Sequence, residues 1–193
     1  PYDVVIVGDD AALQFAMEYR EELFPEIPVV FEGVNDEEYA MKAAENPLVT
    51  GIIEKLSVEK NIDMALKVNP TADKVVAILD DSVTADAERK NFYNSAENYP
   101  ELEFSEINAA ELETARLQQA ISKVDDKTIL IYIVMSKDGS GKQYTSDQAL
   151  CMIVDYAKVP VYRMVEAGIG DGLLGGNVVS MYKSGEIAAQ MAM

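Results

Sequence analysis

The chain has 193 residues, enough for one large domain or two small lobes, and its 49% hydrophobic content supports a buried core. A net charge of −18 disfavours nucleic acid as a partner, because nucleic-acid binding requires clustered lysine and arginine to neutralise phosphates. The chain contains no histidine, so it lacks the commonest general base and the commonest metal ligand.

The N-terminal third alternates strand and helix patterns. The β-branched run at 2–7 predicts a strand that ends at Gly8-Asp9-Asp10, and 11–24 then carries apolar residues at helical spacing. Pro25 and Pro28 interrupt that spacing, and a second apolar run ends at Glu32-Gly33. The complete prediction for this part is strands at 2–7, 28–32 and 49–53, with helices at 11–24, 36–45 and 57–68.

A second set of alternating elements follows the break at Asn69-Pro70. The apolar runs predict five strands, which would make a complete doubly wound sheet, and two segments begin with helix-capping patterns, Asn108–Glu111 and Thr145–Gln148. Such alternation is typical of α/β proteins with parallel sheets. The predicted strands are 74–79, 102–107, 128–135, 160–162 and 174–179; the predicted helices are about 83–98, 109–123, 145–157 and 180–193.

Polar residues follow the predicted strands of the first set. Asp9 and Asp10 come after the first strand, and Glu32 and Asn35 lie at the end of the second. Ligands of open parallel sheets bind outside the carboxyl ends of the strands, so we expect these four side chains to contact a ligand. At least one of the two aspartates is also expected to cap the following helix.

The second set offers a matching group of candidates. They are Asp81, Ser82, Ser136, Arg163, Glu166 and Gly168. An arginine at a strand end can hold a ligand carboxylate through paired hydrogen bonds, or it can pair with Glu166. The glycines of 168–172 lack the spacing of a phosphate-binding loop and precede a strand pattern, so their expected role is close backbone approach to a ligand. We expect Cys151 to be a buried structural thiol.

Several segments resemble one family when they are taken in order. Val5-Ile-Val-Gly-Asp-Asp-Ala-Ala12 and Leu23-Phe-Pro-Glu-Ile-Pro-Val-Val-Phe-Glu-Gly-Val-Asn35 are similar to the ABC-transporter substrate-binding-protein-like family, especially to its extracytoplasmic sensor domains of bacterial histidine kinases and diguanylate cyclases. The resemblance continues through 50–54, 69–70, 74–79, 159–162, 168–176 and 185–191, so it covers nearly the whole chain.

The resemblance implies a fold and a division into lobes. The fold is α/β, two-lobed and of the type I periplasmic binding protein kind, with parallel, doubly wound (Rossmann- or flavodoxin-like) sheets. Residues 1–68 and 180–193 would form the first lobe, and 69–179 the second. The family's first lobe has five strands against three here. We therefore expect two strand–helix units ahead of Pro1 in a longer protein, or another chain covering that sheet edge.

The resemblance also implies a function. The chain would bind a small polar molecule, amino-acid-like or an amine, in the interlobe cleft, as a solute receptor or as the sensor of a signalling protein. Its partner would be a membrane permease, or a kinase or cyclase domain, and the chain could also form a homodimer. The full-length protein would be extracytoplasmic and anchored in the membrane. No cofactor, metal or catalytic residue is expected. The alternative is an α/β hydrolase or transferase. The sequence argues against it, because the chain has no histidine, no GxSxG elbow and no phosphate loop.

Overall fold

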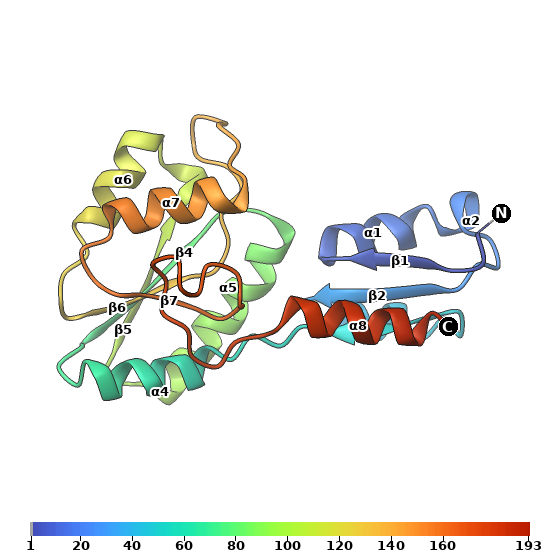
Figure 1. Cartoon of the computed structure of the whole chain (residues 1–193), viewed down its shortest axis with the longest axis horizontal. Helices are drawn as coiled ribbons and strands as arrows, with labels where there is room; N and C mark the ends of the chain where they lie inside the picture. The colour runs from blue at the N-terminus through green and yellow to red at the C-terminus, as the bar shows by residue number, and fades with distance from the viewer. Residues whose placement is uncertain (1) are drawn as a thin grey trace. The chain divides into compact units, whose positions relative to one another are not determined.

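The computed structural model describes residues 2–193, and these divide into two compact units. Among the described residues, the first unit comprises 2–56 and 179–193, and the second comprises 57–178. Each unit is a parallel sheet with helices packed on it, which confirms the predicted α/β class (Figure 1). The predicted lobes differ from these units in one helix, because 57–68 packs with the second unit and was expected in the first lobe.

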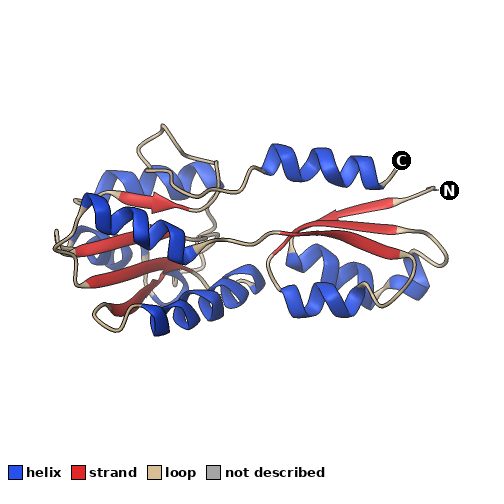
Figure 2. Ribbon diagram, turned by 90° about the horizontal axis from the view of Figure 1, so that it is seen from below, coloured by secondary structure: helices blue, strands red, loops and turns tan. Residues whose placement is uncertain are grey.

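The first unit is built on a three-stranded parallel sheet in the order β1-β2-β3. Helices α1, α2 and α3 lie on one face and α8 on the other (Figure 2). Its core is the cluster around Leu13, Val29, Phe31 and Val34. The elements are β1 (Val5–Gly8), α1 (Asp10–Glu18), α2 (Arg20–Leu23), β2 (Val29–Val34), α3 (Glu37–Ala43), β3 (Val49–Ile53) and α8 (Met181–Met191).

The second unit contains a four-stranded parallel sheet in the order β5-β4-β6-β7. Helices α4 and α5 pack on one face, and α6 and α7 on the other (Figure 1). The elements are α4 (Val58–Val68), β4 (Lys74–Leu79), α5 (Val83–Ser95), η1 (Ala96–Asn98), β5 (Glu103–Asn108), η2 (Ala109–Glu111), α6 (Thr114–Ser122), β6 (Thr128–Tyr132), α7 (Ser146–Tyr156) and β7 (Val161–Arg163).

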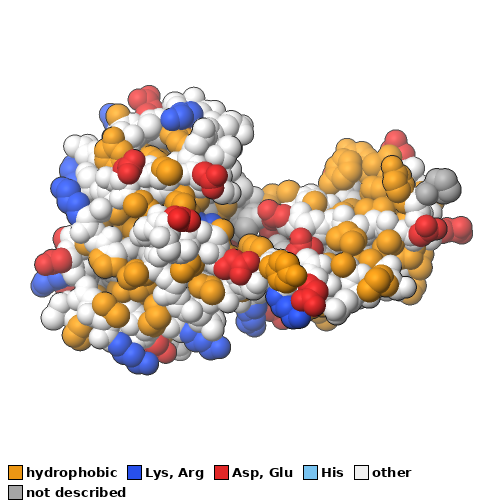
Figure 3. Space-filling model, in the orientation of Figure 1, with side chains coloured by type: hydrophobic (Ala, Val, Ile, Leu, Met, Phe, Trp, Pro, Cys, Tyr) orange, Lys and Arg blue, Asp and Glu red, His pale blue; other side chains and the backbone are white. Residues whose placement is uncertain are grey.

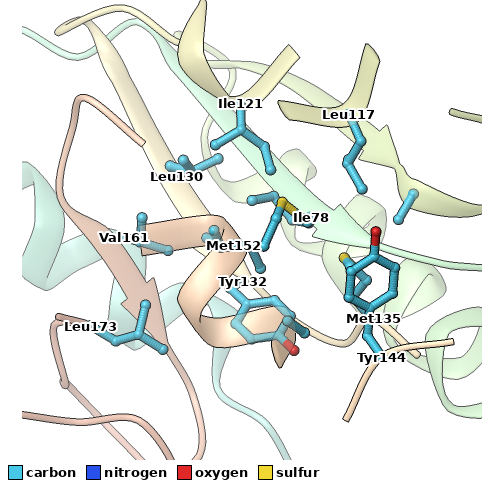
Figure 4. Close-up of a cluster of buried hydrophobic side chains, with 13 residues drawn as sticks. Ile78, Leu117, Ile121, Leu130, Tyr132, Met135, Tyr144, Met152, Val161 and Leu173 are labelled. Carbon is cyan, nitrogen blue, oxygen red and sulfur yellow. The ribbon is translucent and has the colours of Figure 1, made fainter. Parts of the chain in front are cut away.

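One core cluster of the second unit lies between the sheet and helices α6 and α7. Ile78 of β4 and Leu130 of β6 point toward Leu117 and Ile121 of α6 and toward Met152 of α7 (Figure 4). All five residues of β6 are buried, as a central strand covered on both faces requires. Burial of such side chains contributes about 1.5–3 kcal/mol each, so this cluster fixes the strand ends on which the candidate site residues sit.

The structure corrects four expectations about the elements. No strand forms at 174–179, where Leu174 makes only an isolated bridge to Tyr162, so the second sheet has four strands and not five. The predicted strand 128–135 ends at Tyr132. The predicted helix 11–24 breaks at Tyr19 into α1 and α2. The Thr145 cap is confirmed, and Thr145 with Gln148 forms a reciprocal capping box. The predicted helix 109–123 is not continuous, because Asn108 caps only the short 3-10 turn η2 and α6 begins at Thr114.

Candidate functional site

The carboxyl ends of the three strands of the first unit bring acidic side chains together. Gly8 of β1 is the partner of Glu32 in β2, and the backbone N–H of Glu54, one residue after β3, donates to the carbonyl of Val34 at 2.7 Å. Because the strands are parallel, Asp9, Glu32 and Glu54 leave the sheet at the same edge. We call Asp9, Asp10, Glu32 and Glu54 the acidic edge.

Asp9 has an unusual backbone conformation at the start of α1. Its φ is 80° and its ψ is 160°, a region that is populated almost only by glycine and that costs of order 1–3 kcal/mol for other residues. It is the N-cap residue of α1, as predicted, and its carboxylate accepts from the backbone N–H of Asp10 at 2.6 Å. Strain of this size concentrates at ligand-contacting positions, and here it occurs at an exposed acidic residue.

Asp10 and Asn35 connect the first strand end to the second. Oδ1 of Asp10 accepts from the backbone N–H groups of Asn35 and Asp36 at 3.0 and 2.9 Å, and the Asp10 residue is 1% exposed. The amide of Asn35 donates to the carbonyl of Glu54 at 3.3 Å. Both residues therefore hold the loops of the acidic edge in place, and their predicted ligand contacts remain predictions.

Glu32 lies partly exposed in β2 and faces the C-terminal helix. Its Oε2 accepts from the hydroxyl of Ser184 in α8 at 2.8 Å. A β-carbon added to Gly8 would lie only 3.0 Å from its Oε1, so the glycine leaves room for this carboxylate. One oxygen of Glu32 is thus fixed by α8, while the side chain remains partly open to solvent.

Glu54 is the member of the acidic edge that the sequence analysis missed. It is 8% exposed, its Oε1 receives one long bond of 3.5 Å from Asn35, and its buried Oε2 has no hydrogen-bond partner within residues 2–193. Burial raises the pKa of this carboxyl to about 7, and the negative charges of Asp9, Glu32 and Asp10 add to the rise, against a lowering contribution from the Asn35 bond. The pKa of Glu54 therefore lies close to neutral pH, unlike that of an ordinary glutamate.

The strand ends of the second unit are held by a satisfied buried carboxylate. Asp80 follows β4, is fully buried, and accepts from the backbone N–H of Ser82 at 3.0 Å and from the backbone and hydroxyl of Ser136 at 2.7 and 2.6 Å. Burial alone would raise the pKa of Asp80, but these hydrogen bonds outweigh burial and keep it below its usual range. The Ser136 hydroxyl proton is thereby engaged, which leaves its oxygen as an acceptor for a ligand.

Asp81 and Ser82 have structural contacts of their own. Asp81 forms a surface ion pair with Lys137 at 3.0 Å, a contact that contributes at most about 1 kcal/mol. The hydroxyl of Ser82 caps α5 by accepting from the backbone N–H of Ala85 at 3.3 Å. Neither contact tests whether these residues bind a ligand, so both assignments remain predictions.

Arg163 ends β7 and stacks on Tyr132 at the end of β6. The guanidinium carbon lies 3.9 Å from the centre of the Tyr132 ring, and its Nε and Nη1 are buried without a hydrogen-bond partner in the part of the chain described. A cavity of about 30 Å³ beside it is lined by Tyr132, Ser146, Asp147, Leu150, Arg163, Ala167 and Gly168. Arg163 thus offers hydrogen-bond donors at a strand end, as a carboxylate-binding residue would.

Gly168 and Glu166 lie in the turn that follows β7. Gly168 has φ +88°, and a β-carbon there would lie 2.9 Å from Leu173 and 3.0 Å from Leu150, so this position requires glycine. Glu166 is exposed, and its carbonyl accepts from the backbone N–H of Ile169 at 3.2 Å. The turn shares the small cavity with Arg163 through Gly168, whereas Glu166 is not among the residues that line it.

The expectation that Cys151 is buried is wrong. Cys151 is exposed and not buried, and it helps to line a shallow groove of about 480 Å³ between α6 and α7. Cys151 lies within the apolar run 149–153 of an amphipathic helix, but an apolar run around a helix does not lie wholly on its buried face. Ala149, Met152 and Ile153 carry the buried face, and Cys151 lies outside it. None of the predicted site residues lines this groove.

The acidic side chains of the surface are not gathered into one patch on the face drawn in Figure 3. Acidic side chains are scattered over the face seen in Figure 3 and are interspersed with apolar and basic ones. Among residues 2–193, no group of three or more histidine, cysteine, aspartate or glutamate side chains is arranged to hold a metal ion. None of the described helices has the length and apolar character needed to cross a membrane.

In parallel α/β units, ligands bind outside the carboxyl ends of the strands, where these polar side chains lie. The comparison with protein families makes this specific: the sequence profile of the ABC transporter substrate binding protein family matches residues 2–193. The chain therefore belongs to that family, whose members are binding proteins. Comparison with curated proteins gave no significant match, and comparison with solved structures gave none either.

Proposed function

We propose that this protein is an extracytoplasmic receptor for a small amine or amino-acid-like molecule. Family membership supports substrate binding in an ABC-type system, in which a membrane permease is the partner. The expected alternative partner is a kinase or cyclase domain, which would make the chain a sensor. A ligand enclosed by two lobes, membrane anchoring and a homodimer remain predictions from the resemblance stated above.

The observation that carries the ligand class is the acidic edge. Asp9, Glu32 and Glu54 come from the ends of three adjacent strands, and besides burial the negative charges of Asp9 and Glu32 raise the pKa of Glu54. A ligand ammonium placed there would gain charge-assisted hydrogen bonds, which are about twice as strong as neutral ones. An anion at the same place would have to be desolvated next to carboxylates, at a cost of several kcal/mol.

A thermal-shift and calorimetry screen tests this function. The panel consists of ethylamine, putrescine, L-alanine, L-lysine and L-phenylalanine, with succinate, glucose 6-phosphate and glucose as the competing classes. Binding to the folded protein raises its melting temperature by mass action, so the amines or amino acids should raise it and the anions should not. Binding of succinate or the phosphate ester alone would contradict the proposed ligand class.

A substitution at the acidic edge tests whether the ligand binds there. Glu32→Gln keeps an acceptor for Ser184 but removes the charge, and it should weaken ammonium binding about tenfold, equivalent to ~1.4 kcal/mol. Glu22→Gln, on an exposed position of α2, is the matched control and should leave the affinity unchanged. Equal affinities for wild type and Glu32→Gln would place the ligand elsewhere.

A further inference from the structure

Glu54 differs from the other carboxyl groups of the acidic edge in having a buried oxygen without a partner. The residue is 92% buried, and within residues 2–193 its Oε2 makes no hydrogen bond. A β-carbon on Gly33 would lie 3.9 Å from this oxygen and 3.7 Å from the backbone nitrogen of Asp9, so the orphan oxygen and Asp9 approach the same point. A buried carboxylate with one oxygen lacking a donor is costly, and protonation lowers that cost by removing the charge.

We propose that the acidic edge binds an organic cation and that Glu54 releases its proton when the cation binds. The inference rests on the proposed function, because it describes how that ligand would be held. In the balanced step the O–H bond of the Glu54 carboxylic acid breaks and the proton passes to solvent. The carboxylate that remains is stabilised by the positive charge of the bound cation, and no covalent bond to the ligand forms.

The charged groups around Glu54 favour this step. Asp9 and Asp10 face it from the β1–α1 junction, and Glu32 faces it from β2. Each of these negative charges opposes ionisation of Glu54 and attracts a cation. A bound cation would therefore favour the ionised form of Glu54. The only polar side chain that donates to Glu54 among the bonds described is Asn35, and its bond to Oε1 is long at 3.5 Å.

The basic side chains that are close in sequence to the acidic edge have other partners. Lys55 follows Glu54, but its side chain is 82% exposed and pairs with Glu37 of α3 at 3.6 Å. Lys183 on α8, the helix whose Ser184 donates to Glu32, pairs with Glu186 at 2.7 Å. A ligand cation would therefore supply a charge that these lysines do not supply.

The chemistry of the edge favours an organic cation over a metal ion. Oδ1 of Asp10 already accepts two backbone N–H groups, and the Asp9 carboxylate accepts one. The described part of the chain holds no three-residue arrangement suited to a metal. An ammonium needs only one or two acceptors with good direction, and a partly exposed Glu32 with a newly ionised Glu54 would provide the charge.

Proton release makes binding depend on pH in a defined direction. The proton and the cation compete, so by linkage the affinity for the cation rises as the pH rises through the pKa of free Glu54, which is about 7. For a group that is protonated in the free protein and ionised in the complex, the dissociation constant should fall about tenfold between pH 6 and pH 8. The amine probes stay protonated throughout this range.

The experiment is titration calorimetry of the 193-residue chain with the tightest-binding amine or amino acid of the panel. It is carried out at pH 6 and pH 8, in two anionic buffers of different ionisation enthalpy, so that the released protons can be counted. Wild type is expected to release close to one proton at pH 6 and almost none at pH 8. Glu54→Gln, which imitates the protonated acid, should release none and bind with the same affinity at both pH values.

Two further measurements separate the possible outcomes. Carboxyl ¹³C NMR of the free protein should show one glutamate that titrates near pH 7 and is lost in Glu54→Gln, and Glu22→Gln should match wild type in every assay. Binding without proton release and with equal affinity at both pH values would overturn the proton coupling and leave the proposed function standing. If no cation of the panel binds at either pH, the cation site itself is refuted.

Discussion

Replacing Glu54 by glutamine should change how the stability of the protein depends on pH. The carboxyl has a pKa of 4.5 in an unfolded chain and about 7 in the fold. The folded state therefore binds more protons between these values, and the free energy of unfolding falls as the pH rises through them. The stabilising effect of the neutral acid is complete below pH 4.5 and is lost above about pH 7.

The size of the effect follows from the shift. A rise of about 2.5 pKa units corresponds to about 3 kcal/mol over the full range, and about 2.5 kcal/mol of it falls between pH 5 and pH 8. Glutamine has no proton to lose, so Glu54→Gln should avoid this loss. The variant should therefore gain about 2.5 kcal/mol relative to wild type when the pH is raised from 5 to 8.

Urea denaturation at both pH values, followed by circular dichroism, measures this difference. Because the protein has two compact units, hydrogen exchange at β3 should be used to assign the change to the first unit. Glu22→Gln serves as the control and should follow wild type. If wild type and Glu54→Gln lose the same stability between pH 5 and pH 8, Glu54 is ionised throughout, and the argument from its burial is wrong.

Three further substitutions test individual positions. Asp9→Gly should raise the free energy of unfolding by about 1 kcal/mol in a denaturation assay, because glycine adopts φ 80°, ψ 160° without strain. The same variant should bind amines more weakly. A loss of stability would contradict the strain argument. Asp80→Asn should cost about 2–3 kcal/mol by weakening its bonds to Ser82 and Ser136, whereas Asp81→Asn should cost less than about 1 kcal/mol; equal costs would refute the distinction. Gly168→Ala should destabilise by more than about 1 kcal/mol because of its positive φ and the close leucines, whereas Gly185→Ala on the exposed side of α8 should stabilise slightly; melting temperatures of the two variants decide this.

Local pattern determined most of the secondary structure. The β-branched runs and the helical spacing predicted β2, β3 and β4 to within two residues, and the capping signal at Thr145 predicted the start of α7. The signal at Asn108 marks the 3-10 turn η2 and not the start of α6. These features depend on neighbours in the chain, so a sequence contains them directly. The same local reasoning placed Asp9 at a helix start, where the structure shows it capping α1.

Long-range packing decided the rest. Segment 174–179 has a strand-like composition, but only Leu174 meets the edge of β7, so no ladder forms there. Helix α4 was expected in the first lobe, but it packs with the second unit.

Glu54 shows most clearly what only the tertiary structure could reveal. In the sequence it is one acid after a short strand. The order β1-β2-β3 brings it to the same edge as Asp9 and Glu32, and the fold buries one of its oxygens without a donor. A pKa depends on solvent exposure and on charges that are distant in the chain. The sequence therefore determined that acids follow the strands, and the fold alone decided which of them has a raised pKa.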